Sequence, residues 1–338
     1  MPLTPDAIKF LVQLPTLREL SICLPDGVDW LTVEQVSQPV AALTEISLFT
    51  TIQAYTDFAQ AIALPHAEVL SLWLVMHVPV DPDSIVPFFT ALRRQLSPAS
   101  LRSLTIKWNS IAGIVEARAS QVVLRPSHLR PLLDFTTMEH FNLALVCKSA
   151  LDAAFLRDVA RAWPRLTYLS LLCDRRCTPH SLPPLNALAP FAIHCPDLHT
   201  LRVVVYAASG RQEDVDLSEF GGRASTSKLV VLKVGASPIS DPATVAVTIA
   251  RMFPSLVRVG RILPGGFPEG TDPRGKFQAG WNDVSRQYLP MFALVRQDER
   301  IRIAQEDGER GGGYIGSLNS MHKVDLCISE GATFLGTE

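Results

Sequence analysis

One leucine phrase, repeated nine times, is the feature that most constrains how this chain folds. The phrase reads Leu-x-x-Leu-x-Leu, and other apolar residues replace leucine in some copies. Successive copies start 24 to 37 residues apart: Ala67 follows Leu43 by 24 positions, and Met138 follows Leu101 by 37. The first apolar positions are Leu17, Leu43, Ala67, Leu101, Met138, Leu166, Leu198, Leu229 and Leu256. A repeat of this kind indicates that each copy is one structural unit.

The residue between the last two apolar positions is polar or small in every copy, from Ser21 and Ser47 to Lys233 and Gly260. Side chains alternate between the two faces of a strand. Apolar residues two positions apart, with a polar residue between them, therefore indicate a strand with one buried and one solvated face. Each phrase predicts one short strand.

Segments with helical spacing precede several phrases, at residues 7–14, 85–96, 153–163, 185–194 and 243–253. Proline follows in four units, at Pro15, Pro164, Pro196 and Pro254. Proline cannot continue a helix and favours an extended backbone in the residue before it. Each unit is therefore expected to consist of a helix, a proline that ends it, and a strand. Stacked units bury faces that one unit cannot bury alone. We therefore predict an α/β leucine-rich-repeat solenoid, with a parallel sheet on its concave side and helices on its convex side. The spacers after Lys107 and Tyr206 have no obvious helical pattern and are expected to be loops or insertions.

The chain changes character after the last phrase. Trp281, Val284, Tyr288, Met291 and Val295 follow helical spacing, which predicts an amphipathic helix over about 277–302. Pro290 should kink or split this helix. We expect the helix to cap a solenoid domain spanning 1–300, with a docking helix for a partner as the alternative. Residues 303–338 are expected to form a flexible tail.

Composition narrows the function classes. The 31 Lys+Arg and 33 Asp+Glu leave a net charge of -2, which argues against a nucleic-acid partner. The N-terminus has no secretory signal pattern, and no apolar stretch reaches the roughly 20 residues that a membrane span needs. Six cysteines are too few for a disulfide scaffold. We expect a cytoplasmic or nuclear protein with free thiols and no membrane partner.

Linear signatures of catalysis are missing from the sequence: it has no Gly-x-Ser-x-Gly, no Gly-x-x-x-x-Gly-Lys followed by Ser or Thr, and no His-Glu-x-x-His. Zinc ligands could come from Cys173, Cys177, His180, His194 and Cys195, but their irregular spacing favours ordinary buried thiols. The acidic pairs Asp81/Asp83 and Asp214/Asp216 are interpreted as solvated loop charges. We expect no enzyme, metal or cofactor. An enzyme whose groups converge from several loops is the alternative.

The solvated face of the sheet is the remaining candidate site. Its outward positions are Glu19, Glu45, Phe49, Trp73, Lys107, His140, Tyr168, Leu172, Arg202, Lys233 and Arg258. Aromatic and arginine side chains supply much of the binding energy at protein interfaces. We predict a protein-binding face formed by Phe49, Trp73, Lys107, Tyr168, Arg202, Lys233 and Arg258, with Trp73, Tyr168 and Arg202 as anchors. The alternative for Phe49 and Trp73 is that a neighbouring loop covers them.

A resemblance to a known family rests on five repeat segments and on the closing Trp-Asn-Asp-Val at 281–284. The five segments are LPTLRELSI, LSPASLRSLTI, WPRLTYLSLL, CPDLHTLRV and FPSLVRVG. Over residues 5 to about 300, the chain resembles the leucine-rich-repeat region of the F-box-like proteins of mushroom-forming fungi. The resemblance implies a substrate receptor of a cullin-type ubiquitin ligase, with the repeats holding an unknown target protein. Only sixteen residues precede Leu17. An F-box needs some tens of residues, so we expect none here and no Skp-type adaptor bound through one. A nonfunctional fragment of a duplicated family is a further alternative.

Overall fold

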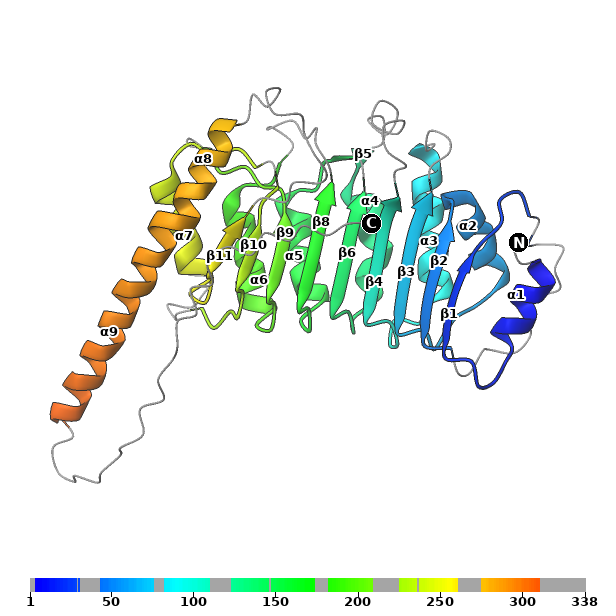
Figure 1. The fold of residues 1–338 in the computed structure, drawn as a ribbon, viewed down its shortest axis with the longest axis horizontal. Coiled ribbons are helices and arrows are strands. Elements are labelled where there is room, and N and C mark those ends of the chain that lie inside the picture. The colour runs from blue at the N-terminus through cyan, green and yellow to red at the C-terminus, as the bar shows by residue number, and fades with distance from the viewer. Residues whose placement is uncertain are drawn as a thin grey trace, which may run out of the picture. The chain divides into compact units, whose positions relative to one another are not determined.

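The nine leucine phrases form the nine strands of one parallel sheet, in chain order, within the described part of the protein (Figure 1). The structure is a computed structural model that describes residues 4–28, 30, 43–75, 82–109, 123–145, 147–173, 182–208, 225–235, 237–260 and 275–310. The strands are β1 Glu19–Cys23, β2 Glu45–Thr50, β3 Val69–Val75, β4 Ser103–Asn109, β6 His140–Leu145, β8 Tyr168–Cys173, β9 Thr200–Val203, β10 Val231–Lys233 and β11 Arg258–Gly260. A separate parallel pair joins β5 Val123–Leu124 to β7 Lys148–Ser149. The prediction of one strand per phrase is confirmed.

The register between strands is set by a backbone hydrogen-bond pattern that recurs from unit to unit. The carbonyl of the residue before each strand accepts two N–H bonds from the next unit. For example, the carbonyl of Arg102 accepts bonds from Glu139 at 2.8 Å and His140 at 2.9 Å. The same double acceptance occurs at Arg18, Thr44, Glu68, Glu139, Thr167, His199 and Val230. Because each unit aligns the next in the same way, the first residues of the nine strands lie opposite one another.

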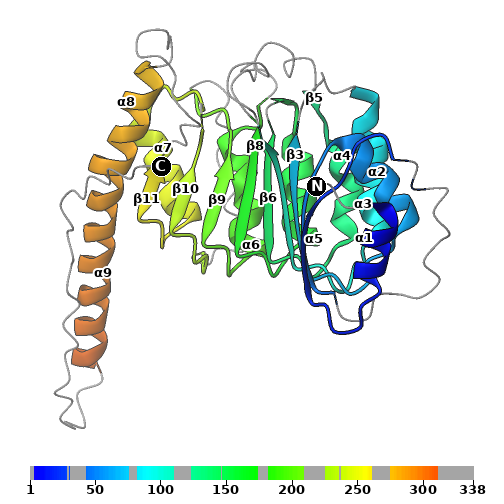
Figure 2. The same cartoon turned by 45° about the vertical axis from the view of Figure 1, so that its right-hand side comes forward.

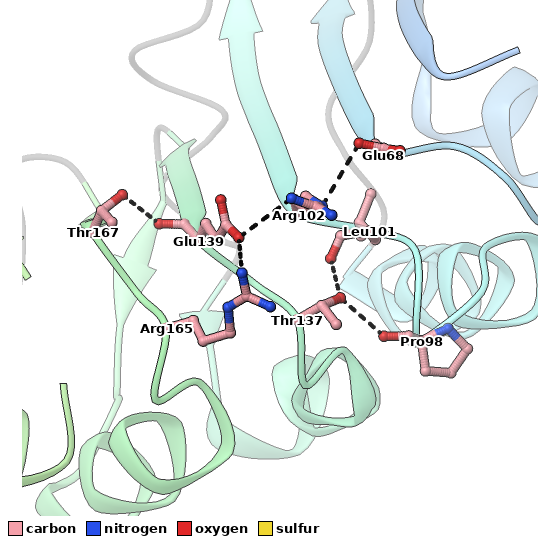
Figure 3. A network of polar contacts seen from close by, with 8 residues as sticks. All are labelled: Glu68, Pro98, Leu101, Arg102, Thr137, Glu139, Arg165 and Thr167. Atoms are coloured by element: carbon pink, nitrogen blue, oxygen red, sulfur yellow. Dashed lines mark hydrogen bonds and ion pairs between the residues drawn. The ribbon is translucent and has the colours of Figure 1, made fainter. Parts of the chain in front are cut away.

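Side chains at the starts of the strands reinforce this alignment (Figure 3). Arg102 lies between two carboxylates, with N–O distances of 3.6 Å to Glu68 and 3.8 Å to Glu139. Arg165 reaches the same Glu139 carboxylate at 2.9 Å. The Thr167 hydroxyl donates to the Glu139 carbonyl at 2.9 Å. These side chains are partly exposed, so each ion pair contributes little free energy, and the backbone bonds carry most of the alignment.

Helices α2, α3, α5 and α6 lie on one face of the sheet, and the opposite face of β2–β9 carries no described helix (Figures 1 and 2). The helices are α1 Pro5–Val12, α2 Ile52–Ala61, α3 Ile85–Gln95, α4 Pro126–Leu129, α5 Ala153–Ala162, α6 Ala189–His194 and α7 Pro242–Met252. Short 3₁₀ turns occupy Pro82–Ser84, Arg130–Asp134 and Leu185–Leu188. The helices expected at 85–96, 153–163, 185–194 and 243–253 are therefore confirmed, the third as a 3₁₀ turn that continues into α6. The one expected at 7–14 starts two residues earlier and ends at Val12.

Two elements differ from the sequence-based expectation in this region. Helix α2 was not predicted, although Thr51 caps its first turn by accepting the N–H of Ala54 at 3.2 Å. The spacer after Lys107, for which no helix was expected, contains α4 and the 3₁₀ turn that follows it. Residues 110–122 of that spacer, and 209–224 of the spacer after Tyr206, lie outside the described residues.

The core lies between the sheet and these helices. The second and third apolar positions of the phrases are buried, as at Leu70, Leu72, Leu104 and Ile106, each with no exposed surface. Burying one such side chain stabilises the fold by about 1.5–3 kcal/mol. The leucine side of each strand therefore faces the helices, and the residues between the leucines face the other way.

The C-terminal segment forms helix α8 Gly275–Asp283, a π-helical turn Val284–Tyr288 and helix α9 Leu289–Arg310. Trp281 is 1% exposed, and its Nε1 donates to the Ser237 carbonyl at 2.9 Å. Helix α8 and the π turn contact α7 and β11, the last strand of the sheet. The amide of Leu289 bonds to the Val284 carbonyl. This wider turn accommodates Pro290, whose ring would otherwise clash with the preceding turn, so the helix is neither split nor ended there.

The helix continues to Arg310, eight residues beyond the expected end at 302. Residues 303–310, which were expected to belong to a flexible tail, are thus helical, because a helix that is already nucleated extends at little further free energy. Residues 311–338 lie outside the described residues. The chain separates into two compact units, 1–292 and 293–338, with the boundary inside α9. No described helix is both long and apolar enough to cross a membrane.

Candidate functional site

The face of the sheet opposite the helices, called the open face below, carries three rows of side chains. The register places residues from nine consecutive units next to one another. The first row comprises Glu19, Glu45, Val69, Ser103, His140, Tyr168, Thr200, Val231 and Arg258. The second comprises Ser21, Ser47, Ser71, Thr105, Asn142, Ser170, Arg202, Lys233 and Gly260. The third comprises Cys23, Phe49, Trp73, Lys107 and Ala144.

Phe49, Trp73 and Lys107 form one contact group in the third row. The Phe49 and Trp73 rings stack with centroids 5.9 Å apart and planes at 14°. The Lys107 ammonium lies 4.8 Å from the Trp73 centroid, within the range of a cation–π interaction. Phe49 is 37% exposed, so no described loop covers it, whereas Trp73 is half-buried between Phe49 and Lys107.

A second group lies across β6, β8 and β9. The His140 and Tyr168 rings stack in parallel, with centroids 4.2 Å apart and planes at 8°. The Arg202 guanidinium carbon lies 5.2 Å from the Tyr168 centroid. Burial lowers the pKa of His140, and the nearby charges of Lys107 and Arg202 lower it further. The neutral imidazole is therefore favoured beside these cations.

Three cations occupy neighbouring strands at the C-terminal end of the open face. Arg202 on β9 is directly opposite Lys233 on β10, and Arg258 begins β11. The pKa of Lys233 is lowered, first by partial burial and then by the charges of Arg202 and Arg258. Among the described strands, the only acidic side chains are Glu19 and Glu45, on β1 and β2. Negative charge thus lies at one end of the open face and positive charge at the other.

Two buried polar atoms, one on Ser170 and one on Arg202, have no hydrogen-bond partner among the described residues. The Ser170 hydroxyl is fully buried and has no hydrogen-bond partner in the described structure. Ser170 is directly opposite Arg202 in the register, and the buried Nε of Arg202 also lacks a described partner. Most buried polar groups in native proteins are hydrogen-bonded, so two such atoms on facing residues mark an unusual place in the sheet.

No protein-family model matches this chain, and no curated protein matches it in sequence. The residues of the chain itself therefore carry what can be inferred about its function.

The structure places all seven predicted binding residues on strands of the one sheet. Phe49, Trp73 and Lys107 come together, Tyr168 and Arg202 come together with His140, and Lys233 and Arg258 extend the second group. The side chain of Leu172, another expected outward residue, lies outside the described residues.

Sequence reasoning did not select His140 and Ser170 as site residues. The signal for both was present, because each stands at an outward position of its phrase. Their contacts depend on the register between units. Aligning the nine phrases residue by residue pairs His140 with Tyr168 and Ser170 with Arg202, and the structure shows that adjacent strands keep this register without a shift.

The cysteines and histidines considered as zinc ligands do not form a described metal site. Cys195 is buried, and its thiol lies 3.4 Å from the carbonyls of both Ala160 and Trp163. Burial raises the pKa of this thiol to about 12, which disfavours the thiolate that metals bind. Cys177 and His180 lie outside the described residues, as do Asp81, Asp214 and Asp216. No group of three or more His, Cys, Asp or Glu among the described residues is placed to hold a metal ion.

Proposed function

We propose that this chain is a leucine-rich-repeat solenoid that binds a protein target on its open face and has no catalytic role. One strand per leucine phrase, strict parallel order and helices on the opposite face support this architecture. Repeat proteins of this design expose an extended, rigid surface formed by equivalent positions of successive units. Such a surface suits recognition of another macromolecule better than enclosure of a small one.

The observation that carries the proposal is the contact group of His140, Tyr168 and Arg202. Their side chains come from three adjacent strands and hold one another in fixed positions. A tyrosine and an arginine that are already ordered lose little conformational entropy when a partner binds. Both residue types dominate the binding energy at protein interfaces. Phe49 and Trp73 add a second ordered aromatic surface on the same face.

The leucine phrases also support a relationship with the F-box-like proteins of fungi. In that case the bound protein would be a target for ubiquitin transfer in the cytoplasm or nucleus. A Skp-type adaptor that co-purifies with the full chain from its native cell would support this part of the proposal. Its absence from such complexes, when other proteins are recovered, would remove the ligase assignment and leave target binding in place.

Peptide selection tests target binding directly. A library of random 12-residue peptides is displayed and selected against the purified full chain. The selected peptides are then measured against the double variant Tyr168→Ala/Arg202→Ala. We expect at least a tenfold loss of affinity, because both anchors are removed. Arg251→Ala is the matched control, since Arg251 is exposed on α7, outside the sheet.

Circular dichroism and urea unfolding of each variant show whether the fold is retained. Selected peptides that bind the folded double variant as tightly as the original chain would contradict the proposal. Failure to select any peptide that needs Tyr168 or Arg202 would contradict it as well.

A further inference from the structure

We propose that the target segment crosses the strands of the open face with an acidic end over Arg202, Lys233 and Arg258. This inference rests on the proposed function and specifies the chemistry of the partner. The occupant is an extended protein segment with several Asp or Glu side chains at one end and an apolar or aromatic middle.

The first support is the placement of the three cations. Arg202 and Lys233 face each other on adjacent strands, and adjacent strands lie about 4.8 Å apart. Arg258 is on the next strand, in the first row. The Tyr168 ring lies beside Arg202 on the open face, and the His140 ring stacks on Tyr168. No described carboxylate neutralises the cluster.

The second support is the repulsion that these charges produce in the free chain. Partial burial lowers the pKa of Lys233 most, and the charges of Arg202 and Arg258 lower it further. An acidic segment would remove this repulsion and add charge-assisted hydrogen bonds, which are stronger than neutral ones. A neutral or basic segment would leave the repulsion in place. The cluster therefore discriminates between partners by charge.

The third support is the pair of buried polar atoms beneath the cluster. Ser170 Oγ and Arg202 Nε are both buried and both lack a described partner. Ser170 is fully buried, and Arg202 is directly opposite it on the next strand. A bound carboxylate does not reach these two buried atoms directly, but its negative charge over the partly exposed Arg202 would offset the free-energy cost of the unpaired Nε–H.

The fourth support is the segregation of charge, which gives the segment a direction. Glu19 and Glu45 lie on the first two strands, and the aromatic pair Phe49 and Trp73 lies on the second and third. A segment with its acidic end over β9–β11 would place apolar side chains toward the aromatic pair and its other end near the two glutamates. Nine strands span eight spacings of about 4.8 Å, or roughly 38 Å, which about 12 extended residues can cover.

The test uses the peptides selected from the random library and a charge-reversed chain, Arg202→Glu/Lys233→Glu/Arg258→Glu. We expect the original chain to select peptides with acidic residues clustered at one end. The reversed chain should bind them at least tenfold more weakly. Raising the salt concentration from 50 to 500 mM should weaken binding to the original chain, because charge attraction is screened. Arg251→Glu, on α7, is the matched control and should leave the affinity unchanged.

The outcomes separate this inference from the proposed function. Selected peptides that require Tyr168 but carry no acidic cluster would overturn the inference and leave target binding intact. Acidic peptides that bind the reversed chain with unchanged affinity would overturn it too. A dimer of the original chain in sedimentation that dissociates in the reversed variant would identify a second copy as the occupant, which also overturns it.

Discussion

The guanidinium of Arg202 lies 5.2 Å from the centroid of the Tyr168 ring, on the neighbouring strand of the sheet. The other partner of Tyr168 is the His140 ring, stacked at 4.2 Å. An aromatic ring held between an arginine and a histidine has few alternative positions. Three units separated along the chain thus form one ordered surface, and the following predictions test its charge and its support.

The titration of His140 should reveal the cations beside it. Burial, Lys107 and Arg202 all lower the pKa of His140 below its ordinary value of 6.5. The unfolded chain therefore takes up this proton first as the pH falls below 6.5, and the folded state loses stability between 6.5 and the lowered pKa. NMR titration of the imidazole should show the low pKa. Arg202→Met should raise it, and Arg251→Met, on α7, should not. A histidine that titrates at 6.5 in the original chain would contradict this.

Lys233→Met should separate stability from binding. The substitution removes a charge that Arg202 and Arg258 repel and keeps a side chain of similar length. The free energy of unfolding should stay the same or rise by no more than about 1 kcal/mol, with the larger gain at low salt. Binding of acidic peptides should weaken in the same variant. Urea unfolding and fluorescence titration measure the two effects. A clear loss of stability would mean that Lys233 supports the fold.

The buried hydrogen bonds between α2 and α3 should be sensitive to Gln95. The Tyr55 hydroxyl donates to Gln95 Oε1 at 2.6 Å, and Gln95 Nε2 donates to the Ile62 carbonyl at 3.0 Å. Gln95→Met leaves both partners buried without a bond, so unfolding should require about 2 kcal/mol less free energy. Adding Tyr55→Phe should recover part of this loss. Gln53→Met, at an exposed position of α2, is the control. A Gln95→Met chain as stable as the original would contradict the prediction.

A side chain at Gly280 should lower the stability of the fold, because α8 packs closely against Ile239 at this position. A Cβ added at Gly280 would lie 2.8 Å from Cγ2 of Ile239. Gly280→Ala gains about 1 kcal/mol of helix propensity, but overpacking of this kind costs about 1–3 kcal/mol. We expect a net loss of unfolding free energy. Because the clash involves Ile239, Gly280→Ala should be less harmful in an Ile239→Ala background, which a double-mutant cycle measures. Additive effects in the cycle would rule out this clash.

Most of the local structure could be predicted from the sequence, because burial alternates within each phrase. Leu70 and Leu72 are buried around a half-buried Ser71, as the pattern indicates. Helix α2 is an element that the local sequence pattern did not lead us to predict. Its buried residues Ile52, Tyr55 and Phe58 recur every three positions, and Thr51 caps it, but it lies in a short spacer between two phrases. The extension of α9 to Arg310 carried no apolar period and could not be found that way.

The candidate site was predictable in its residue types but not in its contacts. Counting the outward positions of the strands identified Tyr168 and Arg202. It also showed that the outward acidic residues come from the first strands and the outward basic residues mostly from the last ones. It could not show that His140 stacks on Tyr168, or that Ser170 is left without a described partner. Those contacts depend on the register that adjacent strands adopt in the folded sheet.

The amino-acid sequence alone determined which side chains are buried and that each phrase forms a strand, because alternation along a strand is a property of neighbouring residues. Only the tertiary structure decided which outward side chains meet. Phe49 and Trp73, and likewise Ser170 and Arg202, become neighbours through backbone hydrogen bonds between units, such as the two that Arg102 accepts from Glu139 and His140. Such bonds join residues from different repeats. The register of these bonds results from the packing of all nine units together. The sequence of a single phrase does not determine it.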